Sequence, residues 1–290
     1  MSRPEPTCKY DLGGRVAVVT GAAGAIGAGI CRKLLQSNCR VAATDLAGER
    51  LEGVIAELEQ VCWAERGRSQ AGEACLSEIV GLPMDVTDPE SVASAIAQIG
   101  SMWGGINIMV HVAGIPLVAR LQDMDLDEFR RLERVNVEGT LLVFREMGKF
   151  FEKQGTGGDI VLISTKNVFS PGASFGAYSA TKAAAHQLAR IASLELAPIG
   201  VRVNMVAPDA VFGEGDRKSG LWQQIGPERM RARGLDERGL EEYYQNRNLL
   251  KARITPEHVA NAVLFFVSRQ TPTTGATIPV DGGLPDATPR

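Results

Sequence analysis

The sequence lacks the features of a membrane protein, a secreted protein or a metalloprotein. Its apolar runs, such as Leu141 to Phe144, are far too short to span a bilayer. The first fifteen residues are polar and contain two prolines, so they lack the apolar core of a secretory signal peptide. The five cysteines are odd in number and form no Cys-x-x-Cys motif, which argues against a disulfide framework or a zinc site. We therefore expect a cytoplasmic protein with reduced thiols, no metal and no membrane partner.

A strong charge of either sign is also missing. The 31 Lys and Arg residues nearly balance the 34 Asp and Glu residues, so no basic field predicts a nucleic-acid partner. Hydrophobic residues make up 44% of the chain and charged residues 22%, which is ordinary for a globular protein with a sizeable core. We find no internal repeat, low-complexity tract or linker. Residues 1–290 are therefore expected to form a single domain, whose partner is a small-molecule substrate.

Short apolar stretches alternate with helical patterns along the chain. A polar, glycine-containing stretch at 66–74 predicts a surface loop. Strands that alternate with helices form a parallel sheet with helices on both faces. The pattern therefore predicts a doubly wound α/β fold. We expect strands at 15–20, 40–44, 77–84, 106–112, 159–163, 201–206 and 276–280, with helices at 28–37, 51–65, 91–102, 126–151, 177–196 and 258–267.

A glycine-rich loop directly follows the first expected strand. Glycines at 21, 24 and 27 would allow a tight turn and let the positive end of the next helix approach a pyrophosphate. A plain turn is the alternative, but the position between a strand and a helix favours a nucleotide site. The expected cofactor contacts in this loop are Gly21, Ala23, Gly24, Ala25, Ile26 and Gly27.

An acidic residue, Asp45, ends the second expected strand. A carboxylate about 20 residues past such a glycine loop typically bonds the adenosine ribose hydroxyls. It would also repel the 2′-phosphate of NADP, and the sequence has no Arg or Lys in the loop or directly beside Asp45. The other role open to Asp45 is to cap the next helix. We therefore expect NAD as the cofactor rather than NADP.

Tyr178 and Lys182 are four residues apart in an expected helix, so their side chains share one face. A free tyrosine has a pKa of about 10 and is a poor base at neutral pH. A nearby ammonium favours the phenolate and lowers that pKa. Such a tyrosine could exchange a proton with an alcohol oxygen. A partly buried aromatic beside a solvated lysine is the plain alternative.

Taken together, the motifs resemble those of the short-chain dehydrogenase/reductase family. The similarity runs from about Asp11 to Gly283, and its motifs occur in the family's order. It implies one Rossmann-like domain with seven parallel strands, and hydride exchange between an alcohol or carbonyl and a nicotinamide cofactor. The matching residues are Thr20-Gly21 with Gly24 and Gly27, Ala113-Gly114, Asn136, Tyr178 with Lys182, and Asp281-Gly282-Gly283.

The resemblance also implies roles for particular residues. Tyr178 would be the acid/base, Lys182 its tuner and a ribose ligand, and Asn136 the holder of a relay water. The remaining contacts with the cofactor would come from Asp85 and Val86 at the adenine, and from Ala113, Gly114, Pro208 and Asp209. Alternatives remain for two of them, since Asn136 could kink or cap a helix and Asp85 could cap a strand end.

The sequence departs from the family pattern in four places. The family serine falls at Thr165, because strand alternation would aim the neighbouring Ser164 elsewhere. The family's usual Asn-Asn-Ala-Gly motif is here His111-Val112-Ala113-Gly114, and we expect His111 to be structural. Asp209 stands where a glycine is commoner after Pro208, and the spacing from Asp45 to Asp85 is long, as a surface insertion would make it.

The segment from Asp209 to Arg253 has the place and length of the family's substrate lid. It contains nine basic and eight acidic residues, so its charge alone names no substrate. Together with Lys166-Asn167 and the ending at 279–283, it resembles the dehydrogenase domain of bifunctional rhamnulose-phosphate aldolase/lactaldehyde dehydrogenase proteins. The alternative role of this segment is an insertion that packs against another subunit in an oligomer. We expect the protein to form a homodimer or a homotetramer.

The substrate prediction depends on Asp209. A carboxylate near the reacting end accepts hydrogen bonds from hydroxyl groups and disfavours a bare apolar ketone. We therefore expect a small hydroxylated substrate, such as a lactaldehyde or a sugar-alcohol derivative, that contacts Thr165, Lys166, Tyr178 and Asp209. For Lys166, facing solvent is equally open. The alternative substrate is an acyl thioester or a steroid, whose pocket would be lined by Val211, Phe212, Leu221 and Trp222. The alternative function is that of a cofactor-binding subunit or regulator with weak or no catalysis.

Overall fold

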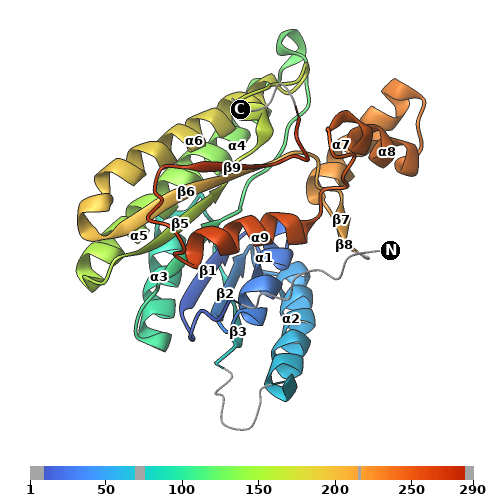
Figure 1. The fold of residues 1–290 in the computed structure, drawn as a ribbon. Helices are drawn as coiled ribbons and strands as arrows, with labels where there is room; N and C mark the ends of the chain where they lie inside the picture. The colour runs from blue at the N-terminus through green and yellow to red at the C-terminus, as the bar shows by residue number, and fades with distance from the viewer. Residues whose placement is uncertain (1–9, 69–75, 215–216, 285–290) are drawn as a thin grey trace.

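The computed structural model of the protein describes residues 10–68, 76–214 and 217–284. Seven parallel strands form its central sheet, in the order β3-β2-β1-β4-β5-β6-β9 (Figure 1). The predicted α/β fold with a seven-stranded parallel sheet is thus confirmed. The strands are β1 Val16–Thr20, β2 Arg40–Asp45, β3 Glu78–Pro83, β4 Ile108–His111, β5 Gly158–Ile163, β6 Val201–Pro208 and β9 Thr277–Val280.

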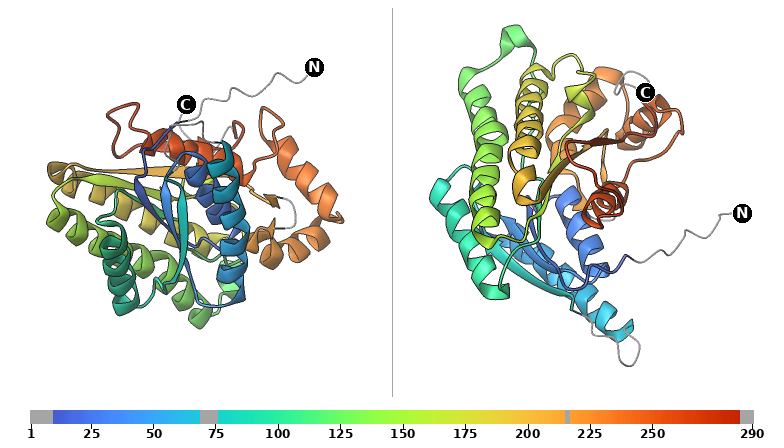
Figure 2. Two further views of the ribbon diagram at one scale, coloured as in Figure 1. Left: turned by 90° about the horizontal axis from the view of Figure 1, so that it is seen from below. Right: turned by 60° about the vertical axis from the view of Figure 1, so that its left-hand side comes forward.

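Helices cover both faces of this sheet (Figures 1 and 2). One apolar core lies between the sheet and α1 Ala25–Gln36, α2 Glu49–Arg68 and α9 Pro256–Val267. A second core lies on the opposite face, under α3 Pro89–Trp103, α5 Gly139–Gln154 and α6 Gly176–Glu195. Central strands such as β1 and β5 are buried along their whole length, which explains why they are continuous apolar runs rather than alternating ones.

The winding of the sheet decides where a ligand can bind. From β1 the chain moves outward through β2 to β3, and from β4 it moves the other way through β5 and β6 to β9. The direction therefore reverses between β1 and β4. In open α/β sheets, ligands bind in the crevice beyond the carboxyl ends of the strands at this switch point.

The long helix expected at 126–151 is interrupted. It comprises α4 Leu126–Glu133, a π-helical segment at Arg134–Glu138 and α5. Asn136 lies in the π segment and its side chain bonds the loop after β4, accepting from the Ile115 amide at 2.9 Å and donating to the Ile115 carbonyl at 3.0 Å. The extra residue in this turn therefore positions an amide that pins a loop at the switch point.

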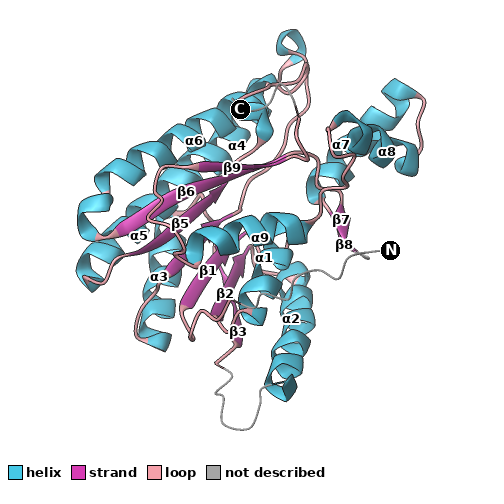
Figure 3. Cartoon of the chain, in the orientation of Figure 1, coloured by secondary structure: helices cyan, strands magenta, loops and turns pink. Residues whose placement is uncertain are grey.

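Two further segments differ from the sequence prediction. The first three residues of the expected surface loop at 66–74, Arg66 to Arg68, belong to α2, and residues 69–74 lie outside the described residues. The segment after β6 forms a short hairpin, β7 Gly213–Glu214 with β8 Arg217–Lys218, and two helices, α7 Gly220–Arg233 and α8 Glu237–Arg247. These helices stand to one side of the sheet, clear of the helices on its faces (Figures 1 and 3). No helix within the described ranges is long and apolar enough to cross a bilayer.

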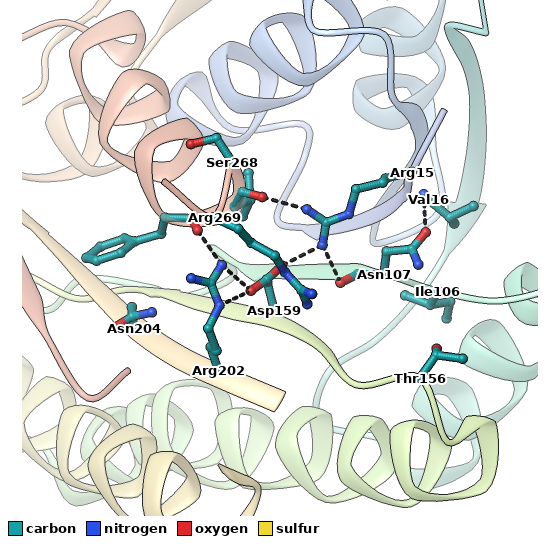
Figure 4. Close-up of polar contacts among 12 residues, drawn as sticks. Arg15, Val16, Ile106, Asn107, Thr156, Asp159, Arg202, Asn204, Ser268 and Arg269 are labelled. Atoms are coloured by element: carbon teal, nitrogen blue, oxygen red, sulfur yellow. Dashed lines mark hydrogen bonds and ion pairs between the residues drawn. The ribbon is translucent and has the colours of Figure 1, made fainter. Parts of the chain in front are cut away.

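At the amino edge of the sheet, three arginines converge on one buried carboxylate (Figure 4). Asp159, whose side chain is 3% exposed, accepts from Arg202 at 2.8 Å and Arg269 at 3.0 Å, and it pairs with Arg15. Arg15 and Arg202 also donate to the carbonyls of Val267 and Phe266 at the end of α9. The cluster therefore satisfies carbonyls that the helix end leaves without partners.

Candidate active site

A cavity of about 720 Å³ opens at the carboxyl edge, beside the switch point. Two of the predicted site residues, Ala23 and Asn136, are buried behind its wall at 4% and 1% exposure. The other predicted residues line it: Gly21, Gly24, Ala25, Ile26, Gly27, Asp45, Asp85, Val86, Ala113, Gly114, Thr165, Lys166, Tyr178, Lys182, Pro208 and Asp209.

The glycine loop packs against backbone so closely that two of its positions leave no room for a side chain. Gly21 has φ +65°, and a Cβ there would lie 2.8 Å from the Ala113 nitrogen, while one on Gly27 would lie 2.2 Å from the Gly21 carbonyl oxygen. Helix α1 begins after Gly24, and among the described residues no side chain caps it. Its first turn also lacks an acidic residue. The free amides and the positive helix end therefore fit a phosphate group.

A chain of hydrogen bonds under the loop explains the unusual histidine. The Thr20 hydroxyl oxygen accepts from the amides of residues 112–113 at 3.1 and 3.2 Å, so its proton is directed to His111 Nδ1 at 2.8 Å. His111 Nε2 then donates to Thr140 Oγ1 at 3.1 Å, and Thr140 donates to the Asn136 carbonyl at 2.7 Å. Burial lowers the pKa of His111 to about 3, so the ring is neutral, as this chain requires. His111 is structural, as expected.

The two acidic residues expected at the adenosine end both bond nearby backbone. Asp45 accepts from the amides of Ala23 at 2.9 Å and Leu46 at 2.8 Å. Asp85 accepts from the amide and the hydroxyl of Thr87, both at 2.8 Å, in the manner of a strand-end cap. Arg50, in the first turns of α2, lines this end of the cavity too. Arg50 was not among the predicted site residues, because it is not one of the immediate neighbours of Asp45 in the sequence.

Thr165, and not Ser164, accompanies Tyr178. The Thr165 side chain lies beside the Tyr178 phenol and lowers its pKa. Ser164 lies on the other side of the strand end, where its hydroxyl bonds His186 Nδ1 at 3.0 Å. Strand alternation accounts for this division, since successive side chains leave a strand on opposite faces. The cavity therefore contains a threonine hydroxyl next to the tyrosine.

The electrostatics of Tyr178 and Lys182 differ from the sequence expectation. Burial raises the pKa of Tyr178 to about 12, although the neighbouring Thr165 side chain opposes this shift. Burial lowers the pKa of Lys182 to about 8. The Lys182 ammonium donates to the Ile163 carbonyl at 3.1 Å, so it is directed at the backbone. The expected lowering of the tyrosine pKa is therefore wrong for this arrangement, because desolvation is the largest influence on that pKa and raises it.

Comparison with known proteins identifies the family. The model of the short chain dehydrogenase family matches residues 15–224. The chain belongs to the short-chain dehydrogenase/reductase family. Its members are oxidoreductases that bind a nicotinamide cofactor and small-molecule substrates.

Individual relatives agree with this membership. The chain is 35% identical to the uncharacterized oxidoreductase YuxG of Bacillus subtilis, over 95% of this chain but only 38% of that protein's length. It is 28% identical to a sorbitol-6-phosphate 2-dehydrogenase of Escherichia coli (93% and 98% covered) and 30% identical to a D-threitol dehydrogenase of Mycolicibacterium smegmatis (94% and 94%). A solved short-chain dehydrogenase/reductase from Mycobacterium ulcerans is 26% identical, with a TM-score of 0.78 over 95% of this chain and 90% of that one.

At the far end of the cavity of this short-chain dehydrogenase/reductase, Asp209 meets residues that the sequence did not single out. Lys166 faces the cavity, and it is joined there by arginines at 229, 233 and 247 from α7 and α8. The spacing of four between Arg229 and Arg233 was a usable indication, because it puts both on one helix face. The fold, however, is needed to show that this face turns toward Asp209.

The apolar lining expected as an alternative is only partly present. Val211 and Trp222 line the cavity. Phe212 lies behind, in a small core with Leu240 and Tyr244, with its ring stacked on Trp222 at a centroid distance of 4.2 Å. The side chain of Leu221 lies outside the described part of the structure. The aromatic residues of this segment therefore serve largely to join α7 and α8 to the body of the protein.

Proposed function

We propose that the protein is an NAD-dependent oxidoreductase that interconverts a secondary alcohol and a carbonyl on a small hydroxylated substrate. The observation that carries the proposal is the placement of the Thr165 and Tyr178 side chains beside each other on the wall of the cavity. Two neighbouring hydroxyl groups there can both bond one substrate oxygen. The glycine loop and α1 supply the phosphate site of a dinucleotide along the same cavity.

In this proposal Tyr178 transfers the proton, and Thr165 stabilises the substrate oxygen with a hydrogen bond. A bound nicotinamide supplies hydride transfer to or from the substrate carbon. With a pKa raised by burial, the Tyr178 phenol is protonated at neutral pH and can donate its proton to a carbonyl oxygen. Oxidation requires the reverse transfer, from the alcohol oxygen to the Tyr178 phenolate. Thr165 donates a hydrogen bond to the same oxygen as charge develops on it.

Lys182 and Asn136 support this proton transfer. Lys182 Nζ and Asn136 Oδ1 both lie close to Gly114, since a Cβ there would be 3.1 Å from each atom. Glycine at 114 therefore leaves room beside the lysine. We propose that Lys182 holds the cofactor ribose, and that Asn136, placed by the π turn, orients the group that returns protons from solvent.

The preference for NAD is proposed from Asp45. Two backbone amides hold its carboxylate at the end of β2, where the adenosine ribose of a bound dinucleotide would lie. A carboxylate there accepts hydrogen bonds from two ribose hydroxyls and repels a phosphate. Arg50 lines the same end and would attract a phosphate, so it opposes this preference.

The substrate class is proposed from Asp209 and from the relatives. Burial raises the pKa of Asp209, while Arg247 and Lys166 oppose the shift and favour the carboxylate. A carboxylate held there bonds substrate hydroxyls. The relatives named for sorbitol 6-phosphate and D-threitol act on sugar alcohols, which supports the same class. We propose that residues 209–253 form the substrate lid of a single domain, and the narrower resemblance to lactaldehyde dehydrogenases stays a prediction.

The test is turnover with matched substrates. Purified protein and NAD are mixed with lactaldehyde, 2,3-butanediol, threitol and sorbitol, and with 3-hydroxybutyryl thioester as the apolar counterpart, and NADH is followed by its absorbance. We expect turnover with at least one polyol or diol, and faster turnover with it than with the thioester. Clear NAD binding without any turnover would instead assign the protein to the cofactor-binding regulators.

A further inference from the structure

Four cationic side chains gather around Asp209 at the substrate end of the cavity. Lys166 follows Thr165 directly, and Arg229, Arg233 and Arg247 come from α7 and α8. The charges of Asp209 and Arg247 both shift the pKa of Lys166, and the charges of all three arginines lower the pKa of Tyr244. The groups are therefore close enough to form one cluster. Four positive charges thus face one carboxylate.

Aromatic rings, not carboxylates, hold the arginines in place. The guanidinium carbon of Arg229 lies 4.5 Å from the ring centroid of Phe175, and those of Arg233 and Arg247 lie 4.8 and 5.0 Å from neighbouring tyrosine rings. A ring contacts the face of a guanidinium and leaves the N–H groups in its plane free to donate. In the part of the chain that the structure describes, none of the four cations forms an ion pair within 4.0 Å.

The remaining polar contacts of the cluster are few. Lys166 Nζ donates to the Ser170 carbonyl at 2.9 Å, which leaves two of its N–H groups. Arg229 Nε is buried without a hydrogen-bond partner among the described residues, and its Nη2 reaches the Ala173 carbonyl only at 3.5 Å. Four partly buried cations that face only one carboxylate repel one another at a cost to stability. An anion in the cavity would offset that cost.

We infer that the substrate carries an anionic group, a phosphate monoester or a carboxylate, which Lys166, Arg229 and Arg247 bind while Asp209 bonds its hydroxyls. This inference rests on the function proposed above and narrows its substrate class. A fork of planar N–H donors fits either anion, because both present two oxygens to a guanidinium. The dinucleotide pyrophosphate has a separate site, at the amino end of α1.

Binding measurements test the charge requirement without requiring turnover. The NAD-saturated protein is titrated by calorimetry with sorbitol, sorbitol 6-phosphate and gluconate, and separately with inorganic phosphate and acetate. We expect at least one charged polyol to bind about tenfold or more tightly than sorbitol, since hydrogen bonds to charged groups are the stronger ones. The better of the two charged probes identifies the anion as phosphate or carboxylate. Equal affinity for all three polyols would overturn the inference.

Variants then locate the effect. Arg229→Gln with Arg247→Gln should remove the advantage of the charged polyol and weaken inorganic phosphate about tenfold, while sorbitol and NAD affinities stay within a few-fold. Arg231→Gln is the matched control, because Arg231 is an exposed arginine of the same helix that donates to the Pro227 carbonyl. An equal loss in the control would mean general electrostatics, and a loss of NAD affinity would mean a cofactor site.

The two proposals can fail separately. If a neutral diol is oxidised well and charged polyols bind no better, the oxidoreductase proposal stands and the anion inference is wrong. If charged polyols bind through the arginines but no substrate is turned over, the anion site stands and the catalytic proposal is wrong.

Discussion

The two edges of the sheet use arginine in opposite ways. At the amino edge, Arg15, Arg202 and Arg269 share the buried carboxylate of Asp159, and two of them also bond helix-end carbonyls (Figure 4). At the carboxyl edge, the arginines of α7 and α8 lie over aromatic rings, and within the described ranges no carboxylate pairs with them. The same residue type is satisfied by the protein at one edge and left with free donors at the other.

This difference separates stability from function. Removing one member of a satisfied buried cluster leaves charges without partners, so stability should fall. Removing a group that faces the cavity leaves the packing nearly unchanged, so stability should hold while activity falls. Each variant below is therefore measured twice, by thermal unfolding and by activity per folded molecule, and a variant that changes the wrong quantity contradicts the comparison.

The largest effect on activity is expected for Tyr178→Phe. Without the phenol oxygen, proton transfer to the substrate is lost, and turnover should fall by ~10²–10⁴. The change removes a single polar atom beside Thr165, so the free energy of unfolding should shift by no more than about 1 kcal/mol. NAD affinity should stay within a few-fold. A variant that keeps the wild-type rate would show that Tyr178 is not the acid/base.

The largest effect on stability is expected for Asp159→Asn. The change removes the one negative charge that faces three arginines, and breaking a buried pair typically costs about 3–5 kcal/mol. Tm should fall by about 10 °C. Activity per folded molecule should stay near wild type, because Asp159 lies at the opposite edge from the cavity.

Glu257→Gln is the control for Asp159. Its carboxylate is half exposed and pairs with Lys33 at 3.3 Å, so its loss should cost less than about 1 kcal/mol. If the two variants lose equal stability, or if Asp159→Asn loses activity instead, the division between the edges fails.

The sequence predicted the fold well because the sheet leaves clear patterns. Both faces are covered, so each central strand appears as a short apolar run, and each glycine or acidic residue that follows marks a carboxyl end. The boundaries were less certain, and α2 runs to Arg68, past the expected end at 65. The sequence offered a helix kink at Asn136 only as an alternative, because the bond between its side chain and a loop 21 residues away leaves no local pattern.

The sequence predicted only those site residues that belong to recognisable motifs or follow from a local rule. The distinction between Thr165 and Ser164 follows from the alternation of a strand, a local rule. The pKa of Tyr178 does not follow from its spacing to Lys182, since burial, the largest influence on that pKa, is a property of the whole fold. Arg229 and Arg247 come from different helices, and only the packing of α7 and α8 directs both to Asp209.

A smaller loss of activity is expected for Thr165→Val. The substitution keeps the volume and removes the hydroxyl, so the rate should fall by ~10²–10³, the effect of losing one donor to a developing oxyanion. Thr165→Ser should retain activity. Ser164→Ala is the control, because the Ser164 hydroxyl bonds His186 instead. A loss of rate in Ser164→Ala with none in Thr165→Val would mean that the Ser164 hydroxyl bonds the substrate oxygen instead.

The smallest effect, on cofactor choice, is expected for Asp45→Asn. Asparagine keeps an oxygen for the amide of Ala23 and loses the exposed bond from the Leu46 amide, so the free energy of unfolding should fall by no more than about 1 kcal/mol. Because the charge is removed, the preference for NAD over NADP should narrow about tenfold, or about 1.4 kcal/mol. Dissociation constants for both cofactors, from fluorescence titration, measure this preference.

Arg50→Ala should widen the preference for NAD, because it removes the cation that favours a phosphate at that end. Glu49→Gln, a nearby exposed charge, should change neither constant. Equal affinity of the wild type for NAD and NADP would mean that Arg50 cancels Asp45, and the NAD assignment would then be wrong.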